Sequence, residues 1–222
     1  MTDQSPSTSV GDYVKAIWEL SRASSDASTK DIAARLSVAP ASVTNMLGRL
    51  QERGLVEYER YRGALLTERG RSEALRLVRR HRLIETFLLE HLGYSWEDVH
   101  EEAERLEHAV SDVFTERLAD LLLHPAHDPH GDPIPKPDGT LPAEETFPLD
   151  EAAEDQTVVI SRVSDNNASG LSYLGERGLR PGSRIRVREV REVDGVVTVE
   201  DEEGGVFSLG RPLAASIFVE PA

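Results

Sequence analysis

Residues 31–70, DIAARLSVAPASVTNMLGRLQERGLVEYERYRGALLTERG, decide the fold of the N-terminal part of the chain. The hydroxyl pair at residues 28–29 is typical of a helix start, and a short amphipathic helix follows it. A turn at residues 37–39 then leads to Pro40, which favours the first turn of a second helix that Gly54 ends. Helix, short turn and helix is the layout of a helix-turn-helix motif.

The residues after this motif predict a β-hairpin. Val56 and Tyr58 alternate as one strand, a turn forms at Arg62-Gly63, and residues 64–67 return as a second strand. Such a wing indicates DNA binding, although three-helix units with a hairpin also bind proteins. The local excess of arginine favours DNA, because guanidinium groups bind phosphates. We expect contacts to base edges from Ser42, Thr44 and Asn45, and contacts to phosphates from Arg49, Arg60 and Arg62.

The charge is distributed unevenly along the chain, whose formal net charge is −15. Residues 1–82 hold 14 Lys and Arg against 10 Asp and Glu, a net of +4. Residues 83–155 hold 3 against 20, a net of −17, and residues 156–222 hold 8 against 10, a net of −2. A mildly basic N-terminal module is therefore joined to a strongly acidic middle, which has a reason to bind cations.

The composition excludes several classes of protein. The chain has 222 residues and no Cys, so disulfides and thiolate metal sites are excluded. It has no run of eighteen apolar residues, and residues 1–11 lack the layout of a signal peptide. We therefore expect a cytoplasmic protein with no membrane partner.

All seven histidines fall between residues 81 and 130, among many carboxylates. A subset has helical spacing, which brings side chains to one face of a helix: His81 and Glu85, then His100, Glu104, Glu107 and His108. Two such helices packed together would place imidazoles and carboxylates in a small volume, suited to Mn2+, Fe2+, Co2+ or Zn2+. The alternative is an ordinary solvated face. Apolar residues interleave with these groups and favour the metal site, because an unpaired charge beside a core is unfavourable.

Two long helices are expected around these residues, from Arg71 to about Leu92 and from about Trp96 to Leu123. The apolar stripe of the second helix is wider than one partner helix needs, which predicts a dimer interface. The next stretch, HPAHDPHGDPIPKPDG, contains five prolines. A segment with so many prolines does not form a helix that would bring its histidines to one face. His124, His127 and His130 are therefore expected to be loop residues rather than ligands.

The period of the apolar pattern changes to two from Gln156. Five segments then predict short strands: TVVISRV, RIRVREV, GVVTVED, GVFSLG and SIFVE. A short helix is expected at residues 171–177. Some 65 residues of short strands favour a small barrel.

Five segments in order resemble the diphtheria-toxin-repressor and manganese-transport-regulator family of metal-dependent transcriptional repressors. They are DYVKAIWEL, the stretch 31–70, RRHRLIETFL, VHEEAERLEHAVSD and PHGDPIP, within residues 10–135. LGERGLRPGSRIRV resembles the small SH3-like C-terminal domain of that family. Ordered segments of this kind are far more specific than a lone helix-turn-helix.

The resemblance implies two metal sites per subunit. The implied ligands are His81, Glu85 and His100 at one site, and Asp12, Glu104, Glu107 and His108 at the other. Oxygen donors stand where the iron-sensing branch has sulfur, which favours Mn2+ with Fe2+ as the alternative. Lys15 departs from the manganese branch, which has a Glu there. The C-terminal domain of iron-type members adds two ligands, for which residues 165–167 are only candidates.

We therefore expect a mainly α-helical chain with small β parts. Its parts would be a winged helix-turn-helix DNA-binding domain (1–72), a helical dimerisation and metal-binding domain (73–138), a linker (139–156) and an SH3-like, FeoA-like barrel (157–222). The expected function is a Mn2+- or Fe2+-dependent regulator, mainly a repressor of metal-uptake genes, which binds a palindromic DNA operator as a homodimer. Two alternatives stay open: a regulator with a structural His/Glu cluster, and a metallohydrolase with an open coordination position.

Overall fold

The computed structural model describes residues 10–22, 26–59, 62–143, 145–165, 167–191 and 193–222. The described residues divide into two compact units. The first unit runs to Arg79 and includes residues 135–140, and the second contains residues 80–134 and the residues from Leu141 onward. The boundary falls inside one continuous helix, α4 (Glu68–Leu92).

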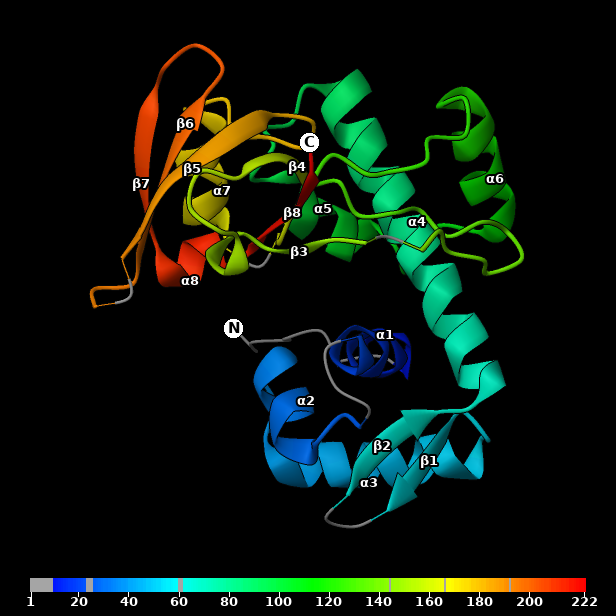
Figure 1. Cartoon of the computed structure of the whole chain (residues 1–222). Coiled ribbons are helices and arrows are strands. Elements are labelled where there is room, and N and C mark those ends of the chain that lie inside the picture. Colours follow the sequence, from blue (N-terminus) through cyan, green and yellow to red (C-terminus); the bar gives the residue numbers. More distant parts are fainter. Residues whose placement is uncertain (1–9, 23–25, 60–61, 144, 166, 192) are drawn as a thin grey trace, which may run out of the picture. The chain divides into compact units, whose positions relative to one another are not determined.

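The first unit is a winged helix. Its elements are α1 (Val10–Ser21), α2 (Thr29–Arg35), α3 (Pro40–Glu52), β1 (Val56–Glu59), β2 (Gly63–Leu66) and the start of α4 (Figure 1). The hydroxyl of Ser28 accepts a hydrogen bond from the backbone N–H of Asp31 and caps α2, while Pro40 occupies the first turn of α3. β1 and β2 pair antiparallel. The predicted helix-turn-helix and wing are confirmed.

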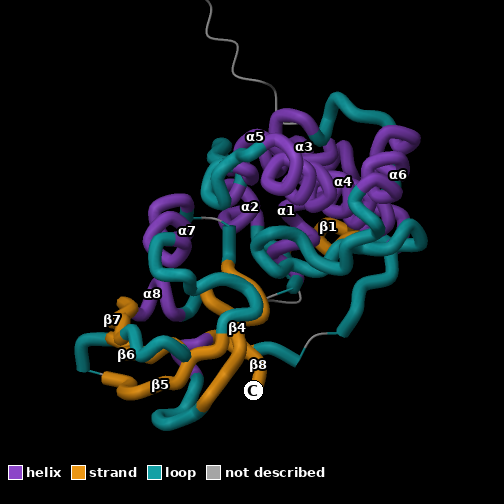
Figure 2. Tube along the Cα trace, turned by 90° about the horizontal axis from the view of Figure 1, so that it is seen from above, coloured by secondary structure: helices purple, strands orange, loops and turns teal. Residues whose placement is uncertain are grey.

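The second unit combines several helices with a six-stranded antiparallel sheet (Figure 2). Its elements are the rest of α4, α5 (Val99–Leu106), α6 (Asp112–Leu121), β3 (Phe147–Pro148), η1 (Leu149–Glu151), β4 (Thr157–Val163), α7 (Ala168–Gly175), β5 (Arg184–Arg191), β6 (Val196–Asp201), β7 (Val206–Gly210), α8 (Arg211–Ala214) and β8 (Ile217–Pro221). The strand order is β3-β8-β4-β5-β6-β7. The five predicted strands are β4 to β8, and the expected helix at 171–177 is α7.

The segment expected to be a linker contributes to this sheet. Phe147 in β3 pairs with Val219 in β8, and Leu149 in η1 is fully buried. Pairing with a partner 72 residues away leaves no periodic pattern in so short a strand, which explains why the sequence does not predict β3.

The single helix expected from Trp96 to Leu123 is wrong, because two helices stand in its place. α5 ends at Leu106, and the hydroxyl of Ser111 accepts a hydrogen bond from the backbone N–H of Phe114 to start α6. The guanidinium of Arg80 fixes the intervening turn, donating to the Glu107 carbonyl and to the Asp112 carboxylate, both at 2.8 Å. The break matters because it turns the side chain of Glu107 inward.

Within the second unit, the residues before α5 and after α6 connect the helices to the sheet. Trp96 lies in the apolar core of the sheet, and its Nε1 donates to the carbonyl of Pro129 at 2.8 Å. The backbone N–H of Val163 at the end of β4 donates to the carbonyl of His130 at 2.8 Å. The proline-rich loop is therefore held between α4 and β4. No helix among the described residues is long and apolar enough to cross a membrane.

Candidate metal centre

The centre begins with two residues one turn apart on α4. His81 is 4% exposed and Glu85 is 0% exposed, because they lie beside Leu83, Ile84 and Leu88 in the helical core. His81 Nε2 lies 2.9 Å from Glu85 Oε1. Spacing of four residues on a helix explains the contact, and the apolar surroundings explain the burial.

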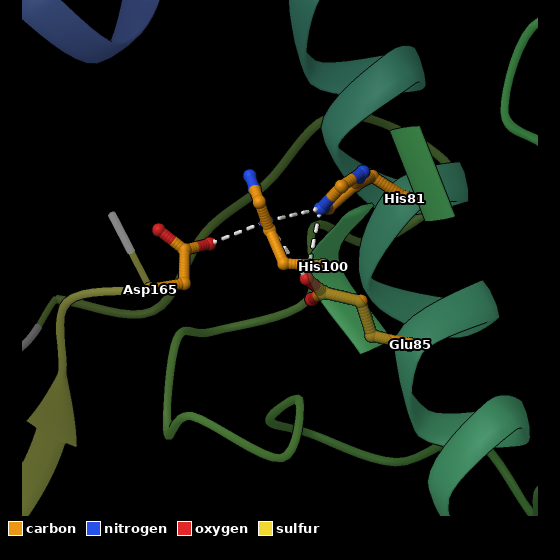
Figure 3. A group of neighbouring side chains, drawn as sticks. All are labelled: His81, Glu85, His100 and Asp165. Carbon is orange, nitrogen blue, oxygen red and sulfur yellow. Dashed lines mark hydrogen bonds and ion pairs between the residues drawn. The ribbon is translucent and has the colours of Figure 1, made fainter. Parts of the chain in front are cut away.

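Two more side chains complete this first group. His100 of α5 places Nδ1 at 3.1 Å from both His81 Nε2 and Glu85 Oε1. Asp165, which follows β4, places Oδ2 at 3.0 Å from the same Nδ1. Figure 3 shows the four side chains pointing toward one another from α4, α5 and the loop after β4. One donor atom from each lies within 4.8 Å of the others.

The geometry and chemistry of the first group suit a divalent cation. Neighbouring donor atoms are 2.9–3.1 Å apart, and adjacent ligands of an octahedral ion with bonds of about 2.1 Å are about 3.0 Å apart. Glu85 Oε2 is buried and has no hydrogen-bond partner among the described residues. A buried carboxylate oxygen of this kind calls for a positive charge.

The protonation of His100 responds to this environment. Burial by itself lowers the pKa of His100, but hydrogen bonds and charge from Asp165 and Glu85 outweigh it and raise the pKa from 6.5 to about 10. Burial opposes ionisation of Asp165, yet the hydrogen bond and charge of His100 hold the pKa of that carboxyl below its usual value. The imidazolium thus satisfies the carboxylates, and a cation that takes Nδ1 must displace its proton.

His81 also faces a second group of donors. Its Nδ1 lies 2.6 Å from Glu107 Oε2, and Glu104 offers a further carboxylate within the same 4.8 Å. His81 Nε2 faces Glu85 in the same way, so each ring nitrogen lies against a carboxylate, which only accepts, and an ion bound at Nε2 would take the place of a proton. Such carboxylate–histidine pairs orient imidazole ligands of metal ions. His108 lies beside this group, with Nε2 3.4 Å from Glu107 Oε1.

A third group was not predicted from the sequence. Glu85, Asp128 and His130 are all buried and offer donors within 4.8 Å of one another. His130 Nε2 lies 2.9 Å from the carbonyl of Trp96, so this nitrogen donates; Nδ1 is buried with no hydrogen-bond partner among the described residues. In the tautomer with its proton on Nε2, Nδ1 is available to bind a metal ion.

The remaining ligand predictions have different outcomes. His124 and His127 are exposed, as a loop assignment predicts, whereas the side chain of His130 is buried. Asp12 lies in the first turn of α1, in the other compact unit, and its role as a ligand stays a prediction. Lys15, also in α1, is buried.

The predicted DNA-contacting residues of α3 lie on its exposed side. Val43, Leu47 and Leu50 are fully buried, whereas Ser42, Thr44, Asn45 and Arg49 are exposed. Arg62 is exposed in the wing turn and forms an ion pair of 3.0 Å with Glu59. Arg60 lies outside the described residues. A polar helix face above a buried one fits a recognition helix.

A winged helix followed by buried groups of histidines and carboxylates defines a DNA-binding protein with a candidate metal centre. Three family models match the chain: "Iron dependent repressor, N-terminal DNA binding domain" at residues 6–64, "Iron dependent repressor, metal binding and dimerisation domain" at 67–136, and "FeoA domain" at 147–221. The chain belongs to the diphtheria-toxin-repressor and manganese-transport-regulator family of metal-dependent transcriptional repressors.

Individual relatives agree with this assignment. The HTH-type transcriptional regulator MntR of Geobacillus kaustophilus is 40% identical over 117 residues, covering 53% of this chain and 82% of the relative. The iron-dependent repressor IdeR of Mycobacterium leprae is 27% identical over 220 residues, covering 94% and 95%. A solved structure described as a manganese-dependent transcriptional repressor in complex with manganese has a TM-score of 0.90, 39% identity and coverage of 96% and 100%. The chain is thus a transcriptional regulator and not an enzyme.

Proposed function

We propose that this regulator is activated by Mn2+, with Fe2+ as the second candidate, and represses metal-uptake genes by binding a palindromic operator as a homodimer. The observation that carries the proposal is the convergence of His81, Glu85, His100 and Asp165 on one largely buried point. Buried carboxylates at this density need a compensating positive charge. A bound ion supplies that charge and joins α4, α5 and the loop after β4.

The donor types support Mn2+. The chain has no Cys, and the three groups offer only imidazole nitrogen and carboxylate oxygen. Hard oxygen donors suit Mn2+, whereas sulfur donors would favour softer ions. Similar solved structures are described as a manganese-dependent repressor with manganese and as ScaR with bound Cd2+, at 39% and 38% identity. Because affinity rises from Mn2+ to Fe2+ at most sites, the metal supply of the cell shares in the choice.

We place two ions in each subunit. One ion binds around Glu85, which belongs both to the group with His100 and Asp165 and to the group with Asp128 and His130. The other binds around Glu107 with Glu104 and His108, and the family resemblance adds Asp12 as a ligand. His81 lies between the two, so occupation of one site fixes an imidazole that orients a ligand of the other.

The homodimer is proposed to use the exposed apolar side chains of α6 together with Leu123, which follows this helix. Val113 and Leu121 are 73% and 57% exposed, while Phe114 and Leu123 are also exposed. Four large apolar side chains in eleven residues are unusual on a free surface and typical of an interface. The matched family model over this region is a dimerisation domain, which supports a second copy as the partner.

DNA binding is proposed to use α3 of both subunits. Thr44 and Asn45 would contact base edges, and Arg49 and the wing arginines would contact phosphates. Two recognition helices related by a two-fold axis require a palindromic site, and we propose that the protein acts in the cytoplasm, where it would meet chromosomal DNA. Metal and DNA would be coupled by roughly 1–3 kcal/mol.

Selection from a pool of random DNA duplexes tests this function. The Mn2+-loaded protein should enrich a two-fold symmetric sequence, and the same selection in chelator should enrich none. Equal enrichment in chelator would support the alternative, a metal-independent regulator whose His/Glu groups are structural. Selection with Fe2+ instead of Mn2+ at matched free concentrations ranks the two ions.

A further inference from the structure

A buried arginine lies beside the group formed by Glu85, Asp128 and His130. Arg82 of α4 is only 7% exposed, and its guanidinium reaches the loop after α6 rather than solvent. One Nη donates to the carbonyl of Pro133, and the other donates to Asp132 Oδ1 at 3.0 Å. Its Nε lies 3.4 Å from Asp128 Oδ2. Two hydrogen bonds and one ion pair thus meet the fixed fork of a single side chain.

The loop that receives this guanidinium is shaped by Asp128. Oδ1 of Asp128 accepts from the backbone N–H groups of His130 and Asp132, at 2.8 and 3.0 Å. The backbone N–H of Asp128 donates to the carbonyl of Asp132 at 3.0 Å. The two oxygens of Asp128 therefore have different tasks. One closes the turn that carries His130, and the other faces Arg82.

Arg82 also stabilises the charges of this region. The guanidinium forms ion pairs with the carboxylates of Asp132 and Asp128, at 3.0 and 3.4 Å. Without this cation the two carboxylates would repel one another, and the loop could move away from α4. A lysine could keep the charge but could not reproduce the two directed hydrogen bonds together with the ion pair.

We propose that Arg82 is a positioning residue, which holds the loop of residues 128–134 against α4 so that Asp128 and His130 face Glu85 before an ion binds. The inference rests on the proposed metal-dependent function. The alternative role of Arg82, as a charge only, predicts the opposite change in metal affinity. A fixed positive charge near a cation repels it, so an arginine acting only through its charge weakens metal binding. A positioning arginine strengthens metal binding, because the ligands are already ordered.

Mn2+ binding by Arg82→Met and Arg82→Lys separates the two roles. The readout is free Mn2+ followed by its electron paramagnetic resonance signal, in the full-length protein at pH 7.5. Both variants should bind the ion at Glu85 about 10–100-fold more weakly, as expected when a partner of a metal ligand is lost. A charge-only role predicts tighter binding for Arg82→Met and unchanged binding for Arg82→Lys. Either result overturns the inference.

Arg79→Lys is the matched control. Arg79 lies one turn earlier on α4, is similarly buried, and donates to the carbonyl of Pro135 at 2.9 Å. Its replacement should change Mn2+ affinity less than threefold. If Arg82→Met does not fold, judged by circular dichroism, Arg82→Lys decides alone, because lysine retains the buried charge. Failure of the wild-type protein to bind Mn2+ or Fe2+ would instead contradict the proposed function.

Discussion

Metal binding at the first group should release a proton from His100, because the pKa of this imidazole is about 10 and metal ligands bind through a free nitrogen lone pair. The rise from 6.5 to about 10 corresponds to roughly 5 kcal/mol at about 1.36 kcal/mol per unit. Below pH 10 the ion competes with this proton. Apparent affinity should therefore rise about tenfold per pH unit, or about 100-fold between pH 7 and pH 9.

The stability of the metal-free protein depends on pH in the opposite direction to the metal affinity. A folded-state pKa above the unfolded value means that protonated His100 stabilises the fold fully below about pH 6.5, and this contribution is lost as pH rises through about 10. The increase in melting temperature caused by a fixed Mn2+ concentration should therefore grow from pH 7 to pH 9. Both trends come from one proton.

Isothermal titration calorimetry with Mn2+ measures the proton directly. Titrations at pH 7.5 in buffers of different ionisation enthalpy should give about one proton released for the ion at this group. Asp165→Asn removes the carboxylate charge that helps to raise the pKa of His100, so it should weaken the pH dependence as well as the affinity. Proton release near zero, with an affinity independent of pH, would refute the assignment of His100 as a ligand.

Three further perturbations test the fold, the dimer and the DNA contacts. Gly131 has φ +87°, and an added Cβ would lie 2.1 Å from the carbonyl oxygen of Ser161; Gly131→Ala should lower the free energy of unfolding by more than about 2 kcal/mol in denaturant titrations. Gly204→Ala is its control, with φ +85° in open space and an expected loss of about 1 kcal/mol. Leu121→Asp should give monomers in sedimentation velocity, because it places a charge in an apolar interface. Asn45→Ala should lose about 1–3 kcal/mol of operator affinity by fluorescence anisotropy, with the same salt dependence as the wild type.

A specific result would contradict each of these predictions. Equal destabilisation by the two glycine variants would mean that the loop containing Gly131 does not pack closely against β4. A dimeric Leu121→Asp would remove α6 from the interface. Loss of affinity for all DNA sequences alike in Asn45→Ala would assign this residue to the phosphate backbone rather than to a base.

The sequence predicts the parts of this molecule whose signals are local. Ser28 and Pro40 mark helix starts by their own chemistry, and period-two patterns locate β4 to β8. The spacing of His81 and Glu85 requires only the geometry of one helix. Such features depend on neighbours within a few residues.

The features that the sequence misses, or leaves only as candidates as it does Asp165, depend on contacts between distant segments. Asp165 reaches His100 from 65 residues away, and Asp128 and His130 lie in a proline-rich loop without periodicity. The break between α5 and α6 depends on Arg80, whose guanidinium holds the turn from another helix. A continuous apolar pattern conceals such a break.

The most direct test of metal-activated DNA binding is the affinity for the selected duplex at fixed salt, with chelator and then with saturating Mn2+, by fluorescence anisotropy. Coupling of roughly 1–3 kcal/mol predicts a 5–150-fold increase in affinity with Mn2+. The variant Glu85→Gln should lose most of this increase, since Glu85 belongs to two of the donor groups. Equal affinity of the wild-type protein with chelator and with Mn2+ would contradict the account and leave the donor groups with a structural role.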